Sequence, residues 1–187
     1  MRNLIIGSLL AAVAMFIFGA VYWNSPAVGA GSRDIVDDAA AQAVLKSTVP
    51  ETGLYWVPGL ALMAEDAEKF NTLHEAGPVA MVNIRHQPGP AASAGTFAAG
   101  FLHEWVVCFL IGLLMMRVSP ALSGYGDRVR FVTVVGVVMA VFVNIGSVIW
   151  WRMPMAFQFA EGMYNIIAWF LAGMVLARFV PDRAAGS

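Results

Sequence analysis

Six polar side chains interrupt the long apolar runs of this sequence, and their types are those best able to do chemistry there. They are His103, Glu104, Asn144, Gln158, Glu161 and Asn165. An ionisable side chain in hydrocarbon costs about 3 kcal/mol or more, so it usually faces other helices and marks a functional site. We therefore take these six residues as candidates for binding a proton or a polar ligand.

Helical spacing places three of these candidates at a similar depth. With a rise of about 1.5 Å per residue, Glu104, Asn144 and Glu161 lie about 11 to 12 Å from the nearer ends of their helices. Two carboxyl groups at one level in a low dielectric would not both remain charged without a cation, so they could share a proton. His103 or Arg152 could supply that cation. The pattern predicts one polar chamber in which the candidates converge.

A purely structural role competes with this interpretation. Polar side chains also hold membrane helices together through hydrogen bonds worth about 0.6 kcal/mol each. That role suits Asn144, whereas the carboxyl groups of Glu104 and Glu161 are too costly for it and favour a function. His103 fits either role.

Metal binding is a weaker alternative. His103, Glu104 and Glu161 offer nitrogen and oxygen ligands, but the Glu-x-x-His pairs of di-iron bundles are missing from the sequence. Adjacent residues on a helix also diverge by about 100°. Two histidines and two methionines elsewhere could gather copper, although their spacing matches no standard site. They are His74, His86, Met63 and Met81. The cofactor is therefore left open.

The elements that must position these residues are membrane-spanning helices. Of the 187 residues 59% are hydrophobic and 12% are charged, against about a quarter charged in a soluble domain. Four apolar runs reach the roughly 20 residues needed to cross a bilayer. They are residues 4–23, 96–116, 131–151 and 154–180. We expect an all-α membrane protein built as a bundle of four transmembrane helices.

Small residues at helical spacing predict close packing of these helices. In the first run they are Gly7, Ala11 and Gly19, together with Met15. In the second run Gly100, Glu104, Cys108 and Gly112 form a similar stripe. Such stripes let backbones approach each other, so they should face neighbouring helices.

Composition also excludes several classes of function. The net charge of −1 provides no basic surface for nucleic acid. Cys108 is the only cysteine, which excludes a disulfide within the chain and a CxxC redox pair. The sequence contains no GxxxxGK, HExxH or GxSxG motif.

The distribution of cations predicts the orientation. The connection 117–130 contains three arginines and one aspartate, and the end of the chain after the fourth span holds Arg178 and Arg183 against Asp182, so both should be cytoplasmic. Residues 24–95 carry eight acidic residues against four cations and should lie outside the membrane on the other side. Residues 1–23 should be retained as an anchor, because their apolar stretch exceeds the roughly 7 to 15 residues of a secretory signal. We expect an inner or plasma-membrane protein with both termini cytoplasmic.

The extracytoplasmic segment 24–95 should form a small α+β insert between the first two spans. A helix capped by Ser32 should extend to residue 46, and a second helix should cover residues 64–75. Short strands are expected at 54–57 and 79–84, followed by a linker rich in Pro, Gly, Ala and Ser over residues 87–95.

These features favour a non-enzymatic membrane protein, either an accessory subunit or a small transport or binding component. Its partners would be membrane lipid and a second copy of the chain or a larger membrane complex. The alternative is a membrane-embedded enzyme acting on a lipid or quinone, with or without a metal. His103 and Glu104 would then be acid and base, but no nucleophile or metal ligand set lies beside them in the sequence.

Overall fold

The computed structural model describes residues 1–29, 31–87 and 89–180, and the chain divides into two compact units. One unit combines residues 1–33 with the chain from residue 92 onward, and the other contains residues 34–91. The predicted cytoplasmic tail 181–187 lies outside the described residues, as does Pro88 of the predicted linker.

The first unit is helical, and four of its segments are long and apolar enough to cross a membrane. Its long helices are α1 (Arg2–Trp23), α6 (Ala94–Val118), α7 (Tyr125–Ala140) and α9 (Met155–Phe179). A π-helical turn, η2 (Val141–Ile145), joins α7 to the short helix α8 (Gly146–Trp151), so the chain is helical from residue 125 to 151. The prediction of four span-forming helices is confirmed.

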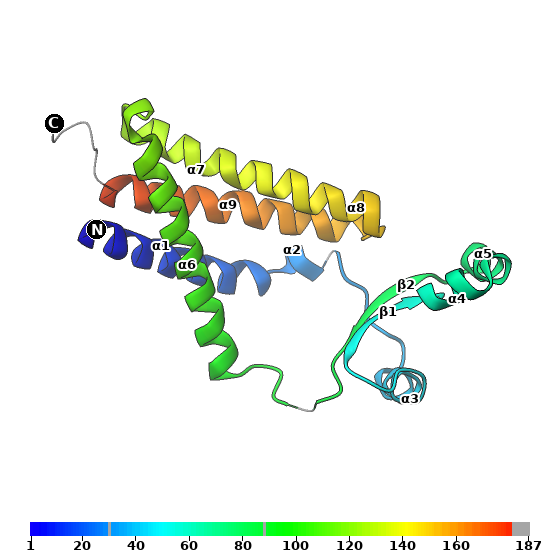
Figure 1. Ribbon diagram of the computed structural model, residues 1–187. Helices are drawn as coiled ribbons and strands as arrows, with labels where there is room; N and C mark the ends of the chain where they lie inside the picture. Colours follow the sequence, from blue (N-terminus) through cyan, green and yellow to red (C-terminus); the bar gives the residue numbers. More distant parts are fainter. Residues whose placement is uncertain (30, 88, 181–187) are drawn as a thin grey trace. The chain divides into compact units, whose positions relative to one another are not determined.

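Helix α9 lies between α1 and α7–α8, while α6 crosses α1 (Figure 1). Gly7 near the start of α1 packs on Phe179 at the end of α9, so these two helices are antiparallel. The predicted stripe of α1 is buried, and so are Cys108 and Gly112 of α6, which confirms that both face other helices. A Cβ added at Gly112 would lie 2.5 Å from Leu4 Cδ1.

The connection between the second and third spans is shorter than the predicted residues 117–130. Helix α6 continues to Val118, a 3-10 turn η1 (Ser119–Ala121) follows it, and α7 begins at Tyr125. Local hydrogen bonds favour this early start, because Ser123 Oγ donates to Asp127 Oδ2 at 2.9 Å. Arg128 is also drawn into the helical unit, where its Nη1 donates to the Val180 carbonyl at 2.7 Å.

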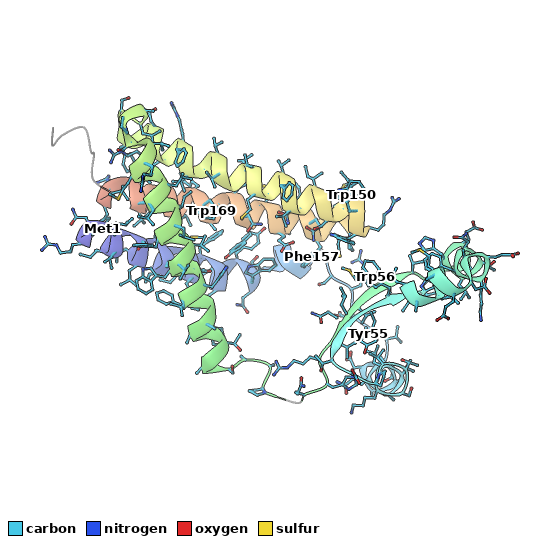
Figure 2. All side chains as sticks on the ribbon, in the orientation of Figure 1. Met1, Tyr55, Trp56, Trp150, Phe157 and Trp169 are labelled. Carbon is cyan, nitrogen blue, oxygen red and sulfur yellow. The ribbon has the colours of Figure 1, made fainter. Side chains whose placement is uncertain are left out.

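The second unit contains a two-stranded antiparallel sheet and three short helices. Strand β1 (Gly53–Val57) pairs with β2 (Ala80–Ile84) so that Tyr55 lies opposite Val82. Tyr55 and Trp56 are labelled on this ribbon in Figure 2. The helices are α3 (Asp38–Thr48), α4 (Leu60–Glu65) and α5 (Ala67–Ala76), and a one-turn helix α2 (Pro26–Gly29) precedes the unit. The predicted small sheet is confirmed.

Both helices predicted for this unit are present, but the start predicted for each of them is wrong. The first helix starts at Asp38 rather than after Ser32, because the Asp37 carboxylate caps it by accepting the Ala40 N–H at 2.9 Å. The helix predicted over 64–75 is two helices that meet at Asp66. The Asp66 side chain caps the second of them by accepting the Lys69 N–H at 2.9 Å.

Candidate functional site

Four of the six predicted polar residues form one hydrogen-bonded cluster between η2 and α9. Asn144 Nδ2 donates to Gln158 Oε1 at 2.9 Å and to Glu161 Oε2 at 3.0 Å. Asn165 Nδ2 in turn donates to Asn144 Oδ1 at 3.2 Å. Asn144 is therefore the centre of the cluster, and we refer to these four residues as the polar cluster.

The local backbone explains how the cluster assembles. Gln158, Glu161 and Asn165 are spaced by three and four residues, which puts them on one face of α9. Asn144 approaches that face from a π turn, a feature that is rare in helices and often found at functional sites. Gly162 of α9 lies beside Asn144, and a Cβ added there would be at an ordinary van der Waals distance of 3.5 Å from Asn144 Oδ1.

The cluster is largely shielded by its neighbours. Asn144 and Gln158 each expose only 4% of their surface, and Glu161 is half-buried. In the described part of the chain, no Lys, Arg or His side chain bonds to the Glu161 carboxyl group, which accepts a hydrogen bond from the Asn144 amide. The site can therefore hold a proton on Glu161 or present a carboxyl and amides to a small polar ligand.

Glu104 belongs to a different set of contacts. It is half-buried on α6, and its buried Oε2 makes no hydrogen bond to any residue that the structure describes. On the side of α9 that faces α1, the Tyr164 ring stacks on that of Phe18 at 5.6 Å between centroids. Glu161 instead bonds to Asn144 of η2, so the hydrogen bonds of the described residues do not join the two carboxyl groups in one chamber.

His103 lies on the exposed surface of α6. The roughly 100° between successive residues of a helix turns it away from the half-buried side of Glu104. The structure therefore does not bring His103 into the polar cluster.

The alternative metal sites find little support in the geometry. Within residues 1–29, 31–87 and 89–180, no group of three or more His, Cys, Asp or Glu side chains could hold a metal ion. His86 Nε2 lies 2.6 Å from the Val49 carbonyl oxygen, and the His74 ring packs 5.8 Å from that of Phe70. These two histidines have separate local partners.

The π turn and the contacts of Tyr22 could not be predicted from the sequence. Apolar, partly β-branched residues surround Asn144, and nothing in that pattern distinguishes a π turn from an α-helix. Tyr22 Oη donates to the Ala160 carbonyl of α9 at 2.7 Å. Its position at the end of an apolar run is typical of an aromatic residue that anchors a helix at the membrane interface, and it does not indicate a contact with α9.

Comparison with known proteins finds no matching family model, no similar curated protein and no similar solved structure. The polar cluster is therefore the basis for assigning a function to this chain.

Proposed function

We propose that this chain is a multi-pass membrane protein that binds a proton or a small polar ligand at Glu161. It acts without catalysis, as an accessory subunit of a membrane complex or as a small transport component. The bias of cations supports an orientation with both termini in the cytoplasm and residues 24–95 outside. In that orientation the polar cluster lies in the outer half of the bundle.

The main support for this proposal is the hydrogen bond from Asn144 Nδ2 to Glu161 Oε2. Glu161 is seven residues from Pro154, which puts it about 11 Å along α9. A carboxyl group at that depth is costly and is rarely kept for packing alone. Amides that hydrogen-bond to one another and to this carboxyl fix its orientation without neutralising it by a cation.

Infrared spectroscopy of the reconstituted protein tests the proton site directly. Difference spectra between acidic and alkaline buffer should contain a carboxyl stretching band in the wild type that Glu161→Gln removes. Glu75→Gln changes an exposed residue of α5 and is the matched control, so it should leave that band in place. Identical membrane-embedded carboxyl signals in the wild type and in Glu161→Gln would overturn the assignment of Glu161.

Purification in mild detergent separates the two roles. An accessory subunit should copurify with defined partners in fixed stoichiometry, whereas a transport component should take up protons or ligand when reconstituted alone. Asn144→Asp keeps the size of the side chain but replaces the amide donor by an acceptor. We expect it to impair whichever behaviour is found, because Glu161 and Gln158 then lose their donor.

A further inference from the structure

The first turns of helix α6 have little cover from the rest of the chain. Residues 94–99 are all exposed, and this part of α6 extends away from the other long helices (Figure 1). Further along the helix, Cys108 and Gly112 are buried against its neighbours. A helix that is long and apolar enough to span a bilayer therefore keeps one side open.

A regular repeat of positions follows this open side. The positions are four and three residues apart in strict alternation, and none of them is buried within the chain. They are Thr96, Gly100, His103, Val107, Leu110 and Leu114. A repeat of 3.5 residues is the spacing at which two helices pack along a continuous line of contact. We call these positions the α6 seam, and Gly100 near its start permits close approach of another backbone.

Two ionisable residues distinguish the α6 seam from a surface that faces lipid. His103 is exposed on it, and the next residue, Glu104, is half-buried at its edge. The Glu104 Oε2 atom is buried without a hydrogen bond to any residue that the structure describes. Ionisable side chains are costly in hydrocarbon and usually pair with one another in membrane spans. These two do not face each other within one helix, because adjacent side chains diverge by about 100°.

A second copy of the chain provides the missing partner for both residues. Copies inserted in one membrane have the same orientation, so a two-fold axis along the membrane normal places their α6 helices side by side and parallel. A side chain on the seam of one helix inserts between four residues of the facing helix. His103 of each copy then lies beside Glu104 of the partner subunit. A different protein would need both an acid and a base at this level, which a second copy has already.

We propose that α6 forms a parallel two-fold interface with α6 of a second copy, joined by two His103–Glu104 hydrogen bonds. In each pair the imidazole of one copy donates to the carboxyl group of the other, so neither ionisable group faces acyl chains. The proposal goes beyond the function assigned to Glu161 and does not rest on it.

Disulfide cross-linking of the full-length chain in membranes tests the geometry. Leu110→Cys places a thiol on the α6 seam one heptad after His103, and oxidation with copper phenanthroline should convert most of it to a covalent dimer. Leu102→Cys is the matched control, because Leu102 is 53% exposed against 57% for Leu110 but lies off the seam. The wild type contains only the buried Cys108 and should remain monomeric on a denaturing gel. Equal cross-linking of the two variants, or none with Leu110→Cys, would overturn the interface.

A double-mutant cycle tests the two pairs. Association of the purified chain in detergent micelles, measured by energy transfer between labelled copies, should weaken about ten-fold in His103→Ala and in Glu104→Ala. The double variant should be no weaker than either single variant, because each change already breaks both pairs. Leu102→Ala truncates an exposed side chain of the same helix and should leave association unchanged. Additive losses, or equal weakening by Leu102→Ala, would contradict the pairing.

Other occupants of the α6 seam give different results. Cross-linking of Leu110→Cys to a different protein, or one tightly bound phospholipid per chain without association of copies, would overturn the second copy as occupant. Glu161→Gln separates this proposal from the proton site, because it changes α9 and leaves the seam intact. Loss of the infrared band with unchanged association supports both proposals. An unchanged band with weakened association in His103→Ala overturns only the proton site.

Discussion

The interface between α7–α8 and α9 has two halves that are built on opposite principles. In the first, which we call the glycine-packed half, Gly136 lies against Trp169 and Gly173 against Val132. In the second, the polar half, Asn144 meets Gln158 and Glu161 across the π turn. One pair of helices thus combines a tight apolar contact with a hydrogen-bonded contact.

The glycine-packed half is therefore expected to stabilise the bundle, while the polar half holds the residues able to bind a proton or a ligand. Close backbone approach over small residues maximises van der Waals contact, which is a main source of helix association in membranes. The π turn interrupts the regular helix and presents Asn144 to α9, where the hydrogen bonds are individually modest. We expect substitutions in the glycine-packed half to affect folding, and those in the polar half to affect binding as well as folding.

The largest expected effect comes from Gly136→Ala. The new Cβ would lie 2.5 Å from Trp169 Cβ and 2.8 Å from Trp169 Cγ, so the two helices must move apart. We expect the free energy of unfolding to fall by about 2 to 3 kcal/mol, measured by tryptophan fluorescence during denaturation with sodium dodecyl sulfate. Gly126→Ala in the first turn of α7 is the control, because nothing lies within 4 Å of its added Cβ. Similar behaviour of the two variants would contradict the tight packing at Gly136.

An intermediate effect is expected from Asn144→Leu. This change removes two donated hydrogen bonds and one accepted bond, and at about 0.6 kcal/mol each the free energy of unfolding should fall by about 2 kcal/mol. Asn165→Leu loses only the bond to Asn144 Oδ1 and should cost about 0.6 kcal/mol. The same denaturation experiment should rank the two, and an equal loss would show that Asn144 is not the centre of the cluster.

The smallest effect is expected from Gly162→Ala, the same substitution as the first but in the polar half. Its Cβ would lie 3.5 Å from Asn144 Oδ1, an ordinary van der Waals distance. Alanine is favoured over glycine in a helix by up to about 1 kcal/mol, so stability should stay constant or rise slightly. A destabilisation as large as that of Gly136→Ala would remove the distinction between the two halves.

The second unit offers no comparable interior. None of the described residues between 34 and 91 is buried within the chain, and the large apolar side chains Val36, Leu54 and Val57 are at least half exposed. A two-stranded sheet of this kind is marginal in isolation. Its elements depend on local signals, such as the Asp37 and Asp66 caps, more than on packing.

Much of the helical architecture could be predicted because hydrocarbon imposes a minimum length on apolar segments. The spacing of Gln158, Glu161 and Asn165 also placed them on one face of α9, and the residue count put Asn144 at the level of Glu161. Which neighbouring helix packs against each face of a given helix could not be predicted in this way. Periodicity describes a helix by itself, and the order of helices around it depends on contacts between distant segments.

Glu104 illustrates this limit. The residue count predicts the same depth for Glu104 as for Glu161, yet α9 presents Tyr164 toward α1 and Glu161 toward η2, so the two carboxyl groups have different neighbours. The η2 turn was equally hidden, because i to i+5 hydrogen bonds leave no pattern in the residue types.

By itself the sequence determined four apolar helices, the polar residues that they carry, and the helix face on which each of these lies, because all three follow from solvent and helical periodicity. Only the tertiary structure decided that Asn144 joins Gln158, Glu161 and Asn165 while His103 stays exposed and Glu104 remains apart. The physical reason is that side-chain hydrogen bonds act over about 3 Å. Meeting at that range depends on how whole helices pack, and residue spacing within one helix carries no information about it.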